Sequence, residues 1–170
     1  MGFKFGTEGY DIDRSLSVSF TGHRTDKLPW GEFEDDEDCL RFKKRLETEI
    51  IRAYNEGARY FLSGMADGVD IYAAEIVLKL SHKLKEMKLV AVFPYGVGST
   101  KRKRRCARHA YRVVSLYRDY VPSCYMERNR FLVEHSVRII CGFSGEESSG
   151  TAATMRMARR GGIDIVTVDI

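Results

Sequence analysis

The chain has 170 residues, of which 44% are hydrophobic and 31% are charged, and its formal net charge is +4. This length and composition predict one globular domain with a substantial core and exclude a low-complexity chain. A charge this small does not by itself indicate nucleic-acid binding. The four cysteines form no CxxC pair and have no histidine at ligand spacing, so we expect no metal site, no disulfide scaffold and reduced thiols.

The sequence divides into a polar N-terminal leader, expected over residues 1–15, and a single domain over residues 16–170. The leader lacks the apolar core of a signal peptide. No apolar run anywhere in the sequence is long enough to span a membrane. We therefore expect a soluble, cytoplasmic protein with no membrane contact.

Short apolar runs alternate with segments of helical periodicity along the whole domain. Strands are expected at residues 16–20, 60–62, 89–93, 137–141 and 163–168. Pro94 is expected to end the third of these strands. Helices are expected at residues 40–54, 69–83, 101–120, 122–133 and 151–160, where residues 112–120 end their helix and lead toward a short strand. This alternation predicts a three-layer, Rossmann-like α/β fold whose mainly parallel central sheet is flanked by helices.

The stretch from Ser136 to Gly162 is the most informative part of the chain. Its strand is followed by a loop of Gly, Ser and Glu and then by a helix that starts at Thr151. The free N–H groups and the dipole at such a helix start attract phosphate, and glycine lets a ligand approach the backbone. Ser149, Gly150 and Thr151 are therefore candidate anion ligands. An ordinary strand–loop–helix connection is an equally frequent explanation.

Two further loops follow predicted strands. Gly22, His23 and Arg24 place a flexible backbone and two possible cationic donors after the first strand, although a solvated surface loop is an alternative. The second loop contains candidate ligand contacts at Ser63, Gly64, Asp67, Gly68 and Asp70. Asp67 or Asp70 could meet a ligand hydroxyl, but capping the following helix is the more common role of such a residue.

Two groups of basic residues complete the set of candidates. Arg128 and Asn129, followed by Arg130, gather donors suited to phosphate or sugar oxygens, unless an arginine pairs with Glu127 or Glu134. The run from Lys101 to Arg108 could contact a nucleic acid or an acidic partner, but a solvated helix face is the commoner arrangement.

A parallel sheet would bring these separate loops together. The carboxyl ends of its strands lie along one edge, where ligands of open α/β sheets bind. Gly22–Arg24, Ser63–Asp70, Pro94 and Ser149–Thr151 are expected to share a crevice there. The sequence thus predicts an electropositive, glycine-floored cleft for a nucleotide or another phosphorylated metabolite.

Five ordered motifs resemble one known family: TGHR, LSGMADGVDIYAAE, the strand ending FPY, MERNRFLVEHS and SGTAATMRMARRGG. They look like the YpsA-like family of the SLOG superfamily, which is similar to the lonely-guy phosphoribohydrolases and to the DNA-processing protein DprA. The resemblance covers residues 16–170. It implies a Rossmann-like fold and a role in binding or sensing nucleotide-derived ligands.

Three positions depart from what the resemblance implies. Lonely-guy enzymes carry Gly-Gly-x-Gly-Thr-x-x-Glu with a catalytic Glu, whereas here Thr154 stands in place of that Glu and Ser149 in place of the first glycine. The segment after Pro94 is basic, from Lys101 to Arg105, where relatives look more acidic.

Our first hypothesis is a nucleotide-binding protein that acts as a ligand sensor or regulatory module, with a nucleotide or ADP-ribose-type ligand. An alternative is a phosphoribohydrolase-like enzyme that cleaves a nucleotide glycosidic or phosphate bond, using Glu75, Asp67, Asp70 or His23 as acid or base. A second alternative is a DprA-like nucleic-acid-binding module that uses Lys101 to Arg108, which is not favoured. We expect a homo-oligomer, as is common among α/β domains of this sort.

Overall fold

A computed structural model of the chain describes residues 3–147 and 149–170. Within these residues six strands alternate with five α-helices. The strands are β1 (Ser17–Gly22), β2 (Tyr60–Ser63), β3 (Lys88–Tyr95), β4 (Arg112–Tyr117), β5 (Arg138–Phe143) and β6 (Asp164–Asp169). The helices are α1 (Glu37–Asn55), α2 (Val69–Ser81), α3 (Lys101–His109), α4 (Cys124–Glu134) and α5 (Gly150–Arg160). Short 3₁₀ turns, η1 (Arg14–Leu16) and η2 (Thr25–Lys27), flank β1.

The strands form one parallel sheet in the order β4-β3-β2-β1-β5-β6. The chain builds outward from β1 to β4 and then returns to the other side of β1 with β5. The order therefore reverses between β1 and β5, whose register pairs Phe20 with Ile140. This topology confirms the predicted Rossmann-like fold with a parallel sheet, and it places a topological switch point at the β1–β5 boundary.

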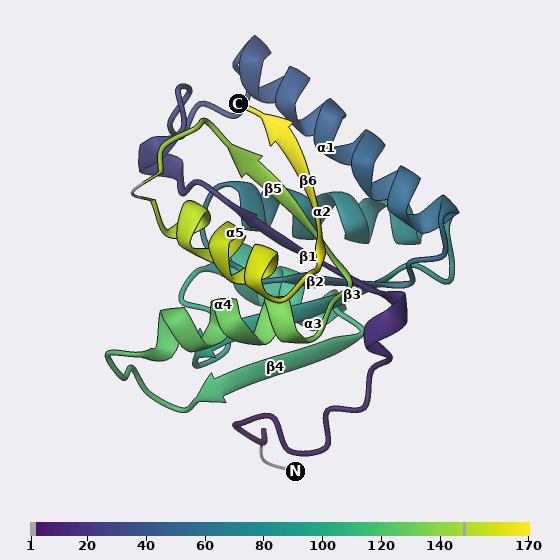
Figure 1. Cartoon of the computed structure of the whole chain (residues 1–170), viewed down its shortest axis with the longest axis vertical. Coiled ribbons are helices and arrows are strands. Elements are labelled where there is room, and N and C mark those ends of the chain that lie inside the picture. The colour runs from purple at the N-terminus through teal and green to yellow at the C-terminus, as the bar shows by residue number, and fades with distance from the viewer. Residues whose placement is uncertain (1–2, 148) are drawn as a thin grey trace.

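Helices cover both faces of the sheet (Figure 1). Helices α4 and α5 lie on one face and contact each other, while α1, α2 and α3 cover the opposite face. The central strands are buried on both faces, as expected for parallel strands between helical layers. Phe20, Phe42, Leu46 and Phe61 are fully buried in the α1–α2 layer, and each contributes about 1.5–3 kcal/mol of transfer free energy.

Local signals explain most helix ends. The acidic run before α1 supplies its N-cap, because the Asp36 side chain accepts a hydrogen bond from the Asp38 amide at 2.8 Å. The expected capping of α2 by Asp67 or Asp70 is wrong. Its N-cap is Gly68, which has a φ of 97° and no side-chain cap bond. A Cβ at Gly68 would lie 2.5 Å from the carbonyl oxygen of His23, so the loop after β1 requires a glycine there.

Two predicted boundaries change in the structure. Residues 112–117 are not the end of a helix but the edge strand β4, which pairs Val113 with Ala91 of β3. Strand β3 also continues through Pro94 to Tyr95. Pro94 is tolerated because β2 pairs only as far as Ser63 with Ala91, so no neighbouring strand on that side requires the missing N–H group.

The segment predicted as a polar leader packs along the β4 edge of the sheet. The Gly6 amide donates to the Ser115 carbonyl at 2.7 Å, and the Tyr10 ring lies 5.0 Å from that of Phe131 in α4. Burial raises the pKa of Tyr10 to about 12. Across the described part of the chain, no helix combines the length and the apolar character that crossing a membrane requires.

Candidate functional site

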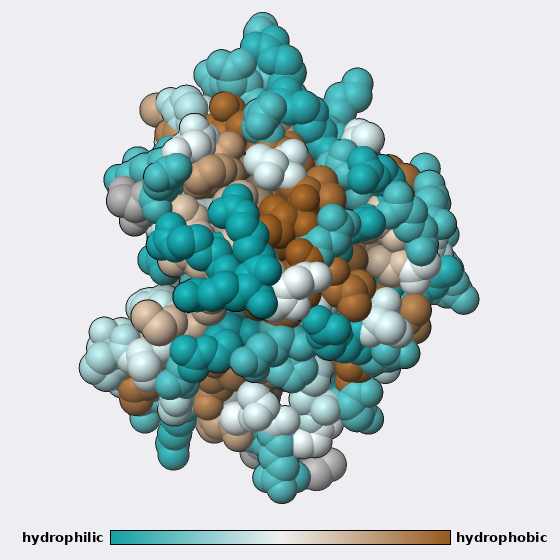
Figure 2. All heavy atoms as spheres, in the orientation of Figure 1, coloured by the Kyte–Doolittle hydropathy of each residue, from teal (hydrophilic) through white to brown (hydrophobic). Residues whose placement is uncertain are grey.

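A cavity of about 510 Å³ lies at the switch point, outside the carboxyl ends of β1 and β5. Residues from the end of β1, the start of α5, helices α2 and α4 and the loops next to them line it. The carboxyl ends lie at the left of Figure 1, and the outline of the molecule is indented there in Figure 2. Nine of the residues predicted as ligand contacts line this cleft: Gly22, His23, Arg24, Asp70, Arg128, Asn129, Ser149, Gly150 and Thr151.

The start of α5 borders the cleft with backbone N–H groups. Ser149 is the N-cap, and its hydroxyl accepts a hydrogen bond from the Ala152 amide at 3.1 Å. Helix geometry leaves the amides of Gly150 and Thr151 without intrahelical acceptors. A Cβ at Gly150 would meet nothing within 4 Å, so a ligand can approach this backbone closely. This end of α5 has the features of an anion site.

Thr154 does not face the cleft. It is fully buried, and its hydroxyl donates to the Gly150 carbonyl at 3.0 Å. The position that the resemblance associates with a catalytic carboxylate therefore stabilises the first turn of α5 instead.

His23 is buried and links the two strand ends. Its Nε2 accepts the Ser144 amide hydrogen at 3.2 Å and lies 2.8 Å from the Ser144 hydroxyl. Because a backbone amide can only donate, Nε2 must be unprotonated. Burial also lowers the pKa of His23. The sequence prediction of a cationic donor is thus wrong for His23, which is a neutral acceptor that fixes the loop after β5.

Asp70 and Arg128 form a buried pair between α2 and α4. Arg128 Nη1 lies 3.8 Å from Asp70 Oδ2 and also donates to the Gly64 carbonyl, while its Nε donates to the Asn129 side chain at 2.8 Å. Asp70 Oδ2 accepts from the Ala66 amide at 3.3 Å. Arg128 therefore does not form the alternative ion pair with Glu127.

The second carboxylate oxygen of Asp70 differs from the first. Asp70 Oδ1 is buried and has no hydrogen-bond partner among residues 3–147 and 149–170. Burial raises the pKa of the Asp70 carboxyl, and Arg128 opposes that shift. Burial also lowers the pKa of Arg128. An unsatisfied buried acceptor is costly, so this oxygen is a natural partner for a donor brought by a ligand.

The cleft is balanced in charge rather than electropositive. Its cationic lining residues are matched in number by carboxylates, and Lys27 lies 3.6 Å from Glu146. The predicted positive field is therefore wrong, and attraction for an anion must come from particular groups. These are the α5 amides and Arg24, an exposed cation that pairs with no carboxylate in the described part of the chain. The charged lining residues are Arg24, Lys27, Arg128, Asp26, Asp70 and Glu146.

A smaller cavity of about 110 Å³ adjoins the cleft, in front of the carboxyl ends of β2 and β3. Gly64, Asp67 and Pro94 line it, together with Met65, whose φ of 59° is unusual for a residue with a side chain. Four residues border both cavities and join them into one groove: Arg24, Ala66, Tyr125 and Arg128.

Ser63, Gly22 and Gly64 have structural roles. Ser63 is fully buried, and its hydroxyl donates to the Asp70 carbonyl at 2.8 Å. A Cβ at Gly22 would lie 2.5 Å from Val69 Cγ1, and one at Gly64 would lie 2.6 Å from Arg128 Nη1. These two glycines allow elements to pack against one another, whereas Gly150 alone of the three opens onto free space.

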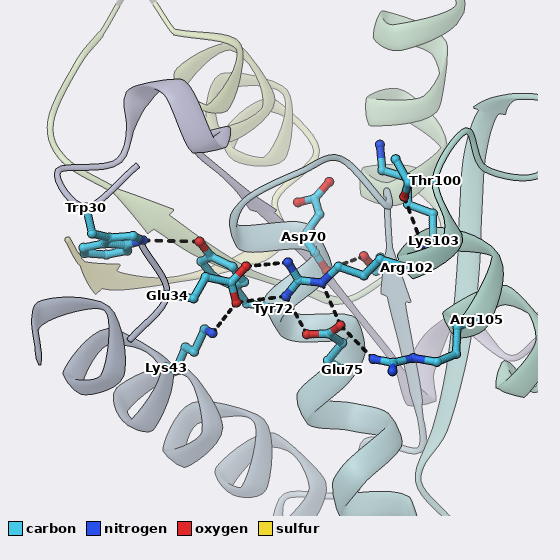
Figure 3. A network of polar contacts seen from close by, with 11 residues as sticks. Trp30, Glu34, Lys43, Asp70, Tyr72, Glu75, Thr100, Arg102, Lys103 and Arg105 are labelled. Atoms are coloured by element: carbon cyan, nitrogen blue, oxygen red, sulfur yellow. Dashed lines mark hydrogen bonds and ion pairs between the residues drawn. The ribbon is translucent and has the colours of Figure 1, made fainter. Parts of the chain in front are cut away.

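The basic run and Glu75 form a separate network (Figure 3). Arg102 lies between Glu34 and Glu75 and makes two hydrogen bonds to each carboxylate. Figure 3 shows the Asp70 carboxylate turned away from this network. The structure therefore places the candidate acid Glu75 outside the cleft. Of residues 101–108 only Lys103 lines the groove, where its Nζ lies 3.2 Å from Asp67 Oδ2.

Sequence reasoning missed Tyr125, which lies at the centre of the groove. A signal for it was present, because Tyr125 precedes Arg128 by three residues and so lies on the same face of α4. Lys27 and Glu146 were also missed, since only the fold brings η2 and the loop after β5 together.

The fold and the position of the groove define a Rossmann-like α/β protein with a polar cleft at its topological switch point. The model of the YspA SLOG family, YpsA, matches residues 18–162, and the chain belongs to this family. It is similar to UPF0398 proteins from several bacteria. That from Bacillus velezensis is 22% identical over 84% of this chain and 83% of the relative. That from Brevibacillus brevis is 28% identical over 64% of this chain and 62% of the relative. One from Staphylococcus aureus is 22% identical over 78% of this chain and 75% of the relative.

Proposed function

We propose that this protein binds a nucleotide or nucleotide derivative in the switch-point cleft and acts as a ligand sensor or regulatory module. The observation that carries the proposal is the meeting of Thr21–Arg24 with Ser149–Thr151 around one cavity of about 510 Å³. Cavities of a few hundred cubic ångströms at this position of an α/β sheet are the usual sites of small ligands.

The chemistry of the lining supports a phosphorylated ligand. The free amides of Gly150 and Thr151 suit phosphate oxygens, and the exposed guanidinium of Arg24 can approach the same anion. The unpartnered Asp70 Oδ1 suits a hydroxyl donor such as that of a ribose. Donors for a phosphate and an acceptor for a hydroxyl group in one cleft match the two ends of a sugar phosphate.

The test compares ligand-induced thermal stabilisation of the wild type with that of Gly150→Asp and Gly150→Ala. AMP and ADP-ribose are the probes, and a hundredfold excess over Kd corresponds to about 2.7 kcal/mol of stabilisation. The aspartate places a carboxylate at the anion site but suits the positive end of the helix dipole, so the fold should be retained. Gly150→Ala adds a methyl group in open space and is the matched control.

We expect the ligand-induced shift to disappear in Gly150→Asp and to persist in Gly150→Ala, while both variants melt within a few degrees of the wild type without ligand. An unchanged shift in Gly150→Asp would refute the location of the site. Absence of any shift in the wild type would refute the proposed ligand class.

A second candidate function is cleavage of a nucleotide glycosidic or phosphate bond. It is favoured by Asp70, because a buried carboxyl group with a raised pKa that borders a cleft is a common catalytic acid. Chromatography of the same ligand mixtures would show new products that Asp70→Asn no longer forms. Unchanged ligand after prolonged incubation with the wild type would leave binding as the function.

A further inference from the structure

Three tyrosines gather at the open end of the smaller cavity. Tyr95 ends β3, Tyr120 lies in the loop after β4, and Tyr125 lies in the first turn of α4. Their ring centroids are 5.8 Å apart for Tyr95 and Tyr120, and 6.3 Å apart for each of these with Tyr125. Three elements that are distant in the sequence thus build one aromatic surface.

This surface is left open to solvent. The exposed fractions are 37% for Tyr95, 58% for Tyr120 and 36% for Tyr125. Aromatic rings gain most of their stabilisation from burial, so three rings packed together yet open on one side can accept a further flat group. Tyr95 and Tyr125 also line the smaller cavity, and the exposed tyrosine surface is therefore continuous with the groove.

Tyr125 lies where the two cavities meet. It borders both, and the guanidinium of Arg24 lies 5.1 Å from the centre of its ring. Arg24 comes from the loop after β1, so this cation–π contact crosses the groove from one wall to the other. An aromatic group in the smaller cavity would therefore lie against Tyr125 while Arg24 stays within reach of an anion in the larger one.

Polar groups at the rim of the smaller cavity can contact the edge of such a ring. Lys103 Nζ supplies donors and Asp67 supplies an acceptor, 3.2 Å apart on one side of the cavity. A flat face, donors and an acceptor at the edge, and an adjoining anion site are together the features of a nucleobase pocket.

We propose that the smaller cavity is a subsite for the base of the ligand, with Tyr125 as the stacking residue. The preferred ligands are then nucleotides that keep their base, in preference to sugar phosphates or inorganic phosphate. This inference rests on the proposed binding of a phosphorylated ligand at α5. Because every base has a π face, stacking alone favours no single base strongly.

The experiment compares pairs of ligands that differ only in the base. Calorimetric titration measures the Kd of AMP, GMP, CMP, UMP and ribose 5-phosphate for the wild type. We expect at least one nucleotide to bind more tightly than ribose 5-phosphate. In Tyr125→Ala its affinity should fall roughly five- to hundredfold, as is usual for loss of a stacking residue. Ribose 5-phosphate should change less than about twofold.

Two further variants separate stacking from structural damage. Tyr125→Phe keeps the ring and should bind the nucleotides within about threefold of the wild type. Tyr111→Ala removes a tyrosine that is 55% exposed at the opposite end of the sheet, where the ring packs on Tyr60, and should leave every Kd unchanged.

The outcomes distinguish the two proposals. Equal loss of nucleotide and ribose 5-phosphate in Tyr125→Ala, or no loss of either, overturns the base subsite. If ribose 5-phosphate binds, is lost in Gly150→Asp and is not surpassed by any nucleotide, the anion site stands and the base subsite falls. If no ligand binds the wild type, both proposals fall.

Discussion

Asp70 Oδ2 lies 3.8 Å from Arg128 Nη1, and both side chains are 7% exposed. Asp70 belongs to α2 and Arg128 to α4, so the pair joins the helical layers on the two faces of the sheet at its carboxyl edge. Burial costs each partner much of its hydration, and a separation of 3.8 Å recovers only part of it. Burying the two charges therefore lowers the free energy of unfolding, while it places both side chains at the wall of the cleft.

The Asp70 carboxyl predicts that stability falls as pH rises. Its folded-state pKa is raised above the ordinary value of 3.8, so between these two values the folded state binds more protons than the unfolded state. Its contribution is fully present below pH 3.8 and is lost as the pH rises through the folded-state pKa.

Asp70→Asn cannot titrate at this position and should show a flatter pH profile than the wild type, and it should melt at a lower temperature because the buried Arg128 loses its counter-charge. The same variant should bind nucleotide more weakly, because an amide changes the acceptor offered to the ligand. Melting curves from pH 4 to 9 provide the check, and Asp67→Asn, at an exposed ion pair, is the control. An equally steep pH profile in Asp70→Asn and the wild type would contradict this account.

His23 predicts a pH dependence of opposite sign. Its pKa is lowered from the ordinary value of 6.5 by burial, so below pH 6.5 the unfolded state takes up protons that the folded state resists. Stability should be present above pH 6.5 and be lost as the pH falls through the folded-state pKa.

Replacement by a neutral residue tests this directly. His23→Gln should remove that slope between pH 6.5 and 5, because its amide does not titrate while its oxygen can still accept from the Ser144 amide. Denaturant titrations at several pH values measure the slope. The exposed His109 offers the control, because His109→Gln should leave the slope in place. A slope that survives in His23→Gln would assign it to another group.

Gly22 should be intolerant of any side chain. The methyl group of Gly22→Ala would lie 2.5 Å from Val69 Cγ1, so β1 and α2 must move apart. Overpacking of this kind costs about 1–3 kcal/mol. Denaturant unfolding measures the loss, and Gly150→Ala is the matched control that should stay within about 0.5 kcal/mol. Adding Val69→Ala should recover part of the loss, and strictly additive effects would argue against a direct clash.

Arg102 should not be replaceable by lysine. It makes paired hydrogen bonds with Glu34 and Glu75, and these carboxylates raise its pKa. An ammonium group cannot keep both forked contacts, so Arg102→Lys should lose about 1–2 kcal/mol, reduced from the buried case because the side chain is 35% exposed.

The loss should shrink in 1 M NaCl, since salt screens the partly exposed carboxylates. Thermal unfolding at low and high salt measures it. Arg104→Lys is the control, because Arg104 makes a single contact with the Gly98 carbonyl at 3.3 Å. Equal stability of Arg102→Lys and the wild type at low salt would show that the network contributes little.

The cleft was predictable from the sequence because its main walls are strand ends. Apolar runs located β1 and β5, and the glycines and donors after them indicated Thr21–Arg24 and Ser149–Thr151. The same local reasoning misassigned residues 112–117, since an edge strand with partial burial has no clear period of its own. Pairing with β3 decides that segment.

The sequence by itself determined the succession of strands and helices, hence the parallel sheet, and the loops that meet at its carboxyl edge. These follow from short-range patterns of apolar, glycine and capping residues. Only the tertiary structure decided which charges remain available: it made His23 neutral, paired Arg128 with Asp70, directed Arg102 to Glu34 and left Arg24 over Tyr125. Burial and the distance between charges set these states, and both depend on neighbours far away in the sequence.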